Sequence, residues 1–172
     1  MTLVSRHYAV LTAIRDTLDA DADLTGLNPT IRKKAYNRGS SWDPGLWVVP
    51  YSRTEKPHEN VTDESSFDCA VIYASPEDQD LTSNLEQHLG VSERVMAIFK
   101  NKAGAQAPYL LRQLDSELAS EGQTKFERSD AKQGPQFPDE AFRSGYDVSA
   151  VIVTVTLIFL RYNSSQLGAP SP

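Results

Sequence analysis

The pattern of apolar and polar side chains predicts a helix near the start of the chain. Between residues 3 and 18, apolar side chains recur at steps of three and four, which places them on one face of an α-helix. These positions are Val4, Tyr8, Leu11, Ile14 and Leu18. Thr2 precedes them and belongs to the residue types that cap a helix N-terminus. We therefore expect a capped helix that ends near Asp19.

Two segments of the first half predict a β-hairpin. Residues 46–51 form an apolar run, and residues 67–74 alternate as a strand does, with every second side chain on the same face. Phe67, Cys69, Val71 and Tyr73 form one face, and Asp68, Ala70, Ile72 and Ala74 form the other. Residues 52–64 between the two strands are charged and contain little apolar surface. We expect them to be a long exposed loop that is flexible until a neighbour orders it.

A long helix is expected next, over residues 76–102. Ser75 followed by Pro76 is typical of an N-cap and the first helical position, and acidic residues follow in the first turn. The apolar stripe consists of Leu81, Leu85, Leu89 (or His88), Val95, Met96 and Phe99. Gly90 is the position at which this helix could divide into two.

The last strongly patterned segment, residues 148–162, predicts a long strand that is apolar on both faces. One face carries Val151, Val153, Val155, Leu157 and Phe159, and we expect it to pack under the helices. The other face carries Ile152, Ile158 and Leu160 beside Thr154 and Thr156. Because the threonines make this face less apolar, we assign it to a subunit interface, although residues 109–118 could cover it instead.

Several weaker segments complete the expected organisation. They are a short strand at 31–36, a helix at 109–118, a short strand at 123–128, a loop at 132–145 and a flexible tail at 163–172. Together these elements predict a single α+β domain over residues 1–162. Its sheet is mainly antiparallel, with the N-terminal helix and the long central helix packed on one face.

Composition and charge narrow the function classes. The 172 residues are 40% hydrophobic and 23% charged, a balance typical of a globular domain. The net charge of −6 disfavours a dedicated nucleic-acid binder, which usually carries a basic excess. Cys69 is the only cysteine, so the chain has neither an internal disulfide nor a cysteine-rich zinc site. The uncharged final strand is too short for a typical membrane helix, and we expect no membrane association.

Chemical motifs are weak, and we expect no catalytic residue, no cofactor and no metal. The acidic run Asp19, Asp21 and Asp23 resembles the start of a calcium loop, but Leu24 stands where that loop needs glycine. His7, His58 and His88 are far apart in the sequence and favour ordinary surface or interface positions. Cys69 lies on an apolar strand and favours a buried structural role. The basic run at residues 32–38 favours a charged edge strand or loop over a phosphate site.

The order of these elements resembles the tail terminator proteins of long-tailed bacteriophages. The similarity rests on an N-terminal helix, a long-looped hairpin, a long helix and a final apolar strand. The segments Ser66-Phe67-Asp68-Cys69-Ala70-Val71-Ile72-Tyr73 and Thr154-Val155-Thr156-Leu157-Ile158-Phe159-Leu160-Arg161-Tyr162 carry it most closely. Residues 103–147 are longer than that family leads us to expect, which leaves another neck or minor tail protein as an alternative.

The resemblance implies a structural, non-enzymatic subunit of a virion. Proteins of that family form hexameric rings that cap the tail tube and join it to the head, with DNA passing through. The implied partners are further copies of the chain, the tail tube and neck or connector proteins, assembled in the host cytoplasm. Within such a ring we assign Arg53, Lys56 and His58 of the charged loop to the subunit interface. The alternative is a small soluble enzyme or ligand-binding domain whose site is assembled from scattered polar residues.

Overall fold

The computed structural model describes residues 5–33, 45–59, 62–76, 81–103, 124–134 and 146–160. These residues form two α-helices, one short 3-10 helix and six strands, arranged in one sheet. In chain order the elements are α1 (Arg6–Asp19), η1 (Thr25–Leu27), β1 (Thr30–Ile31), β2 (Gly45–Pro57), β3 (Thr62–Pro76), α2 (Leu81–Phe99), β4 (Lys102–Ala103), β5 (Thr124–Gln133) and β6 (Tyr146–Leu160).

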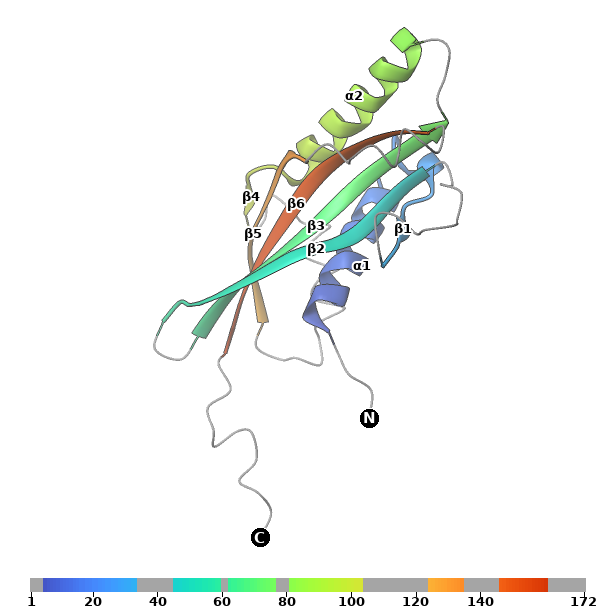
Figure 1. The fold of residues 1–172 in the computed structure, drawn as a ribbon. Helices are drawn as coiled ribbons and strands as arrows, with labels where there is room; N and C mark the ends of the chain where they lie inside the picture. Colours follow the sequence, from blue (N-terminus) through green and yellow to red (C-terminus); the bar gives the residue numbers. More distant parts are fainter. Residues whose placement is uncertain are drawn as a thin grey trace.

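The sheet has the strand order β1-β2-β3-β6-β5-β4. Strand β1 runs parallel to β2, and every other pair in the described sheet is antiparallel. The long strands β2, β3 and β6 lie side by side and twist strongly along their length (Figure 1). Strands β3 and β6 are central, and all 15 residues of β3 have a partner in β6. The sheet is therefore built around the β3–β6 ladder.

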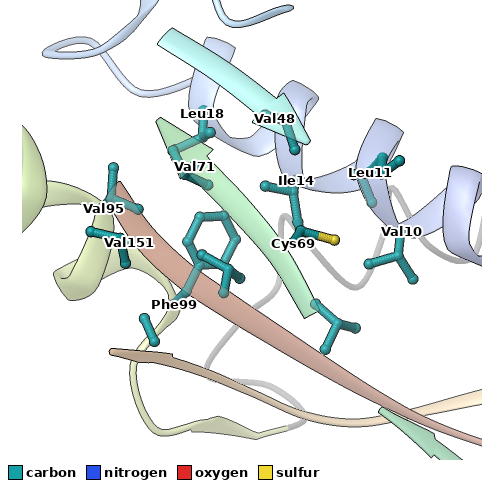
Figure 2. Close-up of a cluster of buried hydrophobic side chains, with 14 of the residues drawn as sticks. Val10, Leu11, Ile14, Leu18, Val48, Cys69, Val71, Val95, Phe99 and Val151 are labelled. Carbon is teal, nitrogen blue, oxygen red and sulfur yellow. The ribbon is translucent and has the colours of Figure 1, made fainter. Parts of the chain in front are cut away.

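Both helices pack against the same face of the sheet, and the main core lies between them and the strands (Figure 2). We call this face the helix face and the opposite one the open face. The core side chains labelled in Figure 2 are Val10, Leu11, Ile14 and Leu18 of α1, Val95 and Phe99 of α2, and Val48, Cys69, Val71 and Val151 of the sheet. The fold is thus α+β, with a mainly antiparallel sheet and both helices on one face, which confirms the sequence prediction.

Helix α1 begins later than predicted. Ser5 is its N-cap, because the Oγ of Ser5 accepts a hydrogen bond of 3.2 Å from the backbone N–H of Tyr8. The expected cap, Thr2, lies outside the described residues. Tyr8 was assigned to the apolar stripe, but it is 58% exposed. It stands two residues before the buried Val10, which in a helix places it on nearly the opposite side.

The hairpin is confirmed, but its predicted long loop is wrong. Strand β2 pairs with β3 from Gly45↔Ala74 through Pro57↔Asp63, with one irregularity between Pro50 and Ser52. Most of the residues expected to form the loop are therefore in the ladder. We call residues 52–66 the hairpin arm. Its far end reaches beyond both helices (Figure 1). The arm forms strands because β6 continues alongside β3 to its start, pairing Thr62 with Leu160.

The predicted start of the long helix is also wrong. Ser75 and Pro76 belong to β3, where they pair with Asp147 and Tyr146 of β6. The helix, α2, starts at Leu81 and continues through Gly90 without a break. The predicted stripe is wrong at Leu85 and Leu89, which are 60% and 50% exposed, whereas the alternative to Leu89, His88, is buried, as are Val95 and Phe99. Among the side chains of α2 that the structure describes, Ser92 is the other buried one.

The final strand has the predicted register. Val151, Val153, Val155 and Leu157 belong to the main core on the helix face. On the open face a second buried cluster joins three strands: Trp47 and Val49 of β2, Ala70, Ile72 and Ala74 of β3, and Ala150 and Ile152 of β6. Ile152 is 2% exposed and so has almost no surface to offer a second subunit. Ile158 is partly exposed on the same face.

The structure confirms the less strongly patterned segments only in part. The strand predicted at 123–128 corresponds to β5, which extends to Gln133 and so takes up the first residues of the predicted 132–145 loop. The strand predicted at 31–36 overlaps with β1 at Ile31. The expected helix at 109–118, residues 135–145 of the predicted loop and the tail at 163–172 lie outside the described residues.

Candidate functional site

A buried polar network beneath α2 is the first candidate for chemistry. Asn84 and His88 stand four residues apart on α2, so they share one face of the helix. Ser75 lies near the end of β3, and Asp147 and Ser149 lie near the start of β6. Ser75 pairs with Asp147 in the ladder, and Tyr73 pairs with Ser149, which places these side chains on the helix face. We call Ser75, Asn84, His88, Asp147 and Ser149 the α2 network.

The direction of each hydrogen bond in the α2 network follows from its carboxylate. Asp147 can only accept, so the Nδ2 of Asn84 donates to Asp147 and the Oδ1 of Asn84 faces Ser75. The Oγ of Ser75 donates to that oxygen at 3.0 Å and thereby uses its single proton. The Nε2 of His88, 2.7 Å from the Ser75 Oγ, must then be the donor of that contact. The unprotonated Nδ1 of His88 accepts from the Oγ of Ser149 at 2.8 Å.

Burial favours the neutral form of His88. The side chain is 8% exposed, and its ring lies 4.6 Å from that of Tyr73. Desolvation lowers the pKa of His88 below that of a free histidine, and the nearby charge of Asp147 opposes the shift. A serine nucleophile needs a histidine that accepts its proton, whereas here His88 donates to Ser75. The arrangement therefore ties α2 to β3 and β6 rather than activating Ser75.

The second candidate is a charged patch on the open face of the hairpin arm. Glu64 of β3 is 6% exposed. Its carboxylate lies 3.1 Å from the Nζ of Lys56, 3.8 Å from the Nδ1 of His58 and 3.6 Å from a guanidinium nitrogen of Arg128. In the ladder Lys56 is directly opposite Glu64, and Glu64 is directly opposite Ile158. We call Lys56, His58, Glu64, Arg128 and Ile158 the arm patch.

The fold brings together three of the residues that the sequence assigned to an interface. Lys56, His58 and Ile158 meet in the arm patch, although they come from two distant parts of the chain. Arg53 is on the other side of the sheet, where it binds Glu55 and lies over the ring of Phe67, 5.0 Å from its centroid. The side chain of Leu160 lies outside the described residues. The interface assignment itself remains a prediction.

Two further sites flagged by the sequence have structural partners. The carboxylate of Asp21 binds the guanidinium of Arg94 of α2 at 2.6 Å, and this hydrogen bond lowers the pKa of Asp21. The thiol of Cys69 is fully buried, 3.7 Å from the Nε2 of His7, and burial raises its pKa. Cys69 is therefore the buried structural residue that its strand pattern predicted, because a nucleophile would need the thiolate.

Sequence reasoning missed the α2 network and misassigned His88, which is buried rather than at the surface. A signal was present in the polar pair Asn84 and His88, placed four residues apart in a helical segment. Asp147 and Ser149 gave another, because they continue the register of Val151 and Val153 with polar side chains. Polar positions on the buried face of both elements suggest that the elements bond to each other.

In the ranges that the structure describes, no group of three or more His, Cys, Asp or Glu side chains is placed to hold a metal ion. None of the described helices combines the length and the apolar composition that crossing a bilayer requires. Comparison with known proteins gives no assignment, since the sequence matches no family model and no similar sequence is found among curated proteins.

The α2 network predicts a coupled loss of stability. Ser75→Ala should lower the free energy of unfolding by about 1–3 kcal/mol, because it leaves the Oδ1 of Asn84 and the Nε2 of His88 without their hydrogen-bond partner. Ser149→Ala should also destabilise the protein, and the double variant should lose less than the two single losses combined, because both act through His88. Urea unfolding of the four proteins measures this. Strictly additive effects, or an unchanged midpoint for Ser75→Ala, would contradict the network.

The desolvation of His7 and His88 should make the stability of the protein depend on pH. Desolvation lowers the pKa of both His7 and His88 in the folded protein, so the unfolded chain binds protons more readily near pH 6.5. Stability should therefore be highest above that pH and fall as the pH is lowered from 7.5 to 5.5. His88→Gln should weaken the dependence of the urea midpoint on pH, and the remaining dependence should be the contribution of His7. A midpoint that rises toward pH 5.5 would show that these pKa values are raised instead.

Proposed function

We propose that the chain is a structural subunit of a bacteriophage tail or neck, similar to a tail terminator, and that it acts by assembling into a ring. The ring would consist of copies of this chain, six in the family that it resembles. It would cap the tail tube and join it to the head through connector proteins. The place of action is then the virion, and the protein does its work through contacts between subunits rather than through catalysis.

The arm patch is the observation that carries this proposal. Lys56, His58 and Ile158 were assigned to an interface for separate reasons, and they are neighbours on one face of the hairpin arm. The patch combines an apolar side chain with basic ones around a buried carboxylate, which suits the mixed contacts of a subunit interface. It lies on a projecting part of the sheet, where a neighbouring subunit can reach it (Figure 1).

The edge of the arm supports the same function. Within the described chain β1 pairs only with Trp47 and Val48, so the outer edge of β2 beyond them has no neighbouring strand. Residues 50–59 are all exposed. Pro50 and Pro57 lack backbone N–H groups, which discourages indiscriminate strand pairing along this edge. Such an edge favours defined side-chain contacts with a neighbour.

Charge is compatible with a passage for DNA. The chain carries a net charge of −6, so a ring of several copies would be strongly acidic. An acidic surface repels phosphates and would allow DNA to pass without adhering. The tail tube and the neck proteins would then be the lasting partners, and DNA only a transient one.

The rival function is a small enzyme, and one contact favours it. The Oγ of Ser75 is 2.7 Å from the Nε2 of His88, a distance typical of a nucleophile and its base. However, the proton of Ser75 points to Asn84, and both Ser75 and His88 are at least nine-tenths buried. We therefore favour the structural role.

Substitutions on β6 test the ring. The wild-type protein should form a closed oligomer, and Ile158→Lys should give a folded species of 19.0 kDa, the mass of one chain. Lysine is chosen because the neighbouring Glu64 would destabilise a new carboxylate. Light scattering and circular dichroism measure both properties.

Two controls separate assembly from folding. Val155 is fully buried, so Val155→Lys should unfold the domain. Leu85 is exposed on α2, away from the arm patch, so Leu85→Lys should leave both the fold and the oligomer intact. A wild-type protein that stays monomeric at all concentrations would contradict self-assembly. An Ile158→Lys oligomer of wild-type mass would refute the interface.

A further inference from the structure

A hollow of about 230 Å³ lies on the open face of the sheet, over β3, β6 and β5. Arg128, Asp130 and Lys132 of β5 line one side, and Ser66, Thr156 and Ile152 lie among the lining residues of β3 and β6. Residues two apart on a strand point to the same face, so the three charged side chains of β5 stand in one row. Of these lining residues only Arg128 also belongs to the arm patch.

The two cationic side chains at the hollow, Arg128 and Lys132, have N–H groups free to donate hydrogen bonds to a ligand. In the part of the chain that the structure describes, the side chain of Lys132 has no ion-pair or hydrogen-bond partner. Arg128 has one ionic contact, the one at 3.6 Å to Glu64, and a guanidinium carries five N–H donors. Both groups can therefore offer charged donors to a ligand.

The acidic residues around the hollow already accept hydrogen bonds from other groups of the protein. Asp130 accepts from the backbone N–H groups of Ala131 at 2.9 Å and Asn101 at 3.4 Å. Asp68, beneath the neighbouring hydroxyls, accepts from Ser52 and Thr154, each at 2.6 Å. Both oxygens of Asp68 and the Oδ1 of Asp130 therefore already accept hydrogen bonds from groups other than Arg128 and Lys132.

The floor of the hollow adds a neutral donor. The hydroxyls of Ser66 and Thr156 are 3.1 Å apart, and one of them donates to the other. Two hydroxyls carry two protons, so one proton remains for a third group. The hydroxyl of Thr154 is already committed to Asp68 and can only accept.

We propose that this hollow binds a phosphate group. A guanidinium, an ammonium and a hydroxyl then donate to it from different directions, which suits the several oxygens of a tetrahedral oxyanion. Ile152 adds one apolar side chain to the lining. The site shares Arg128 with the arm patch, but its other donors lie outside that patch, and phosphate binding does not require ring formation.

Titration with inorganic phosphate tests the site in the full chain. Ionic strength is held constant with chloride, and backbone amide signals are followed by NMR. Residues 128–132 and 154–156 should shift and saturate together. Lys132→Gln should weaken binding roughly tenfold, the loss expected for one charge-assisted hydrogen bond. Lys33→Gln is the matched control, because Lys33 is an exposed lysine beside β1, at the opposite edge of the sheet, and it should bind as the wild type does.

A second arm of the experiment separates the sources of phosphate. A short phosphodiester, such as a dinucleotide, is titrated into the same proteins. Saturable binding that depends on Lys132 for both ligands assigns the site to a phosphodiester backbone as well as to the free ion, and binding of inorganic phosphate alone assigns it to the free ion. Shifts that grow linearly without saturation, or equal affinities for the wild type and Lys132→Gln, would overturn the proposal.

Discussion

The structure depends on the ladder between β3 and β6. All 15 residues of β3 have a partner in β6, and β2 pairs along the other side of the same strand. A strand with neighbours on both sides has its backbone groups satisfied, so its two faces decide where everything else can pack. The helix face is apolar from Phe67 to Tyr73 and receives α1 and α2. The length of the ladder then sets the reach of the hairpin arm.

The open face of the ladder changes character along its length. Near the end of β3 it is apolar, with Ile72 and Ile152 in a buried cluster around Trp47. Toward the start of β3 it becomes polar, where Asp68 joins the hydroxyls of Ser52 and Thr154 across three strands. The hollow and the arm patch both lie on this polar half. One end of this face is therefore buried, and we propose that the other end contacts other molecules.

The sequence predicted helices and strands correctly where the apolar side chains on one face of an element determine how it packs. The alternation of β3 and β6 was predictable because their inward side chains are uniformly apolar, from Val151 to Leu157 in β6. Prediction failed where distant partners decided instead. Ser75 and Pro76 have the local features of a helix start, yet pairing with Asp147 and Tyr146 holds them in β3. On α2 the side chain of His88 is buried, whereas Leu85 and Leu89 are exposed. His88 can be buried because both of its ring nitrogens have hydrogen-bond partners, Ser75 and Ser149.

The candidate sites were harder to predict for the same reason. Lys56, Glu64 and Arg128 come from three strands, and single-sequence reasoning does not supply the register that brings them together. The charge of the arm suggested a loop, whereas its charges face one another across the ladder. Cys69 and its strand were predicted correctly because burial of a small residue needs only the local alternation.

Hydrogen exchange across the hairpin arm tests the account most directly. The central claim is that the arm is an extension of the β3 ladder and not a loop. Amides of β3 between residues 62 and 66 lie between two strands, so they should exchange nearly as slowly as those of residues 67–74. Rapid exchange throughout residues 52–66 would show that the ladder stops short, and the arm and the arm patch would then lose their structural basis.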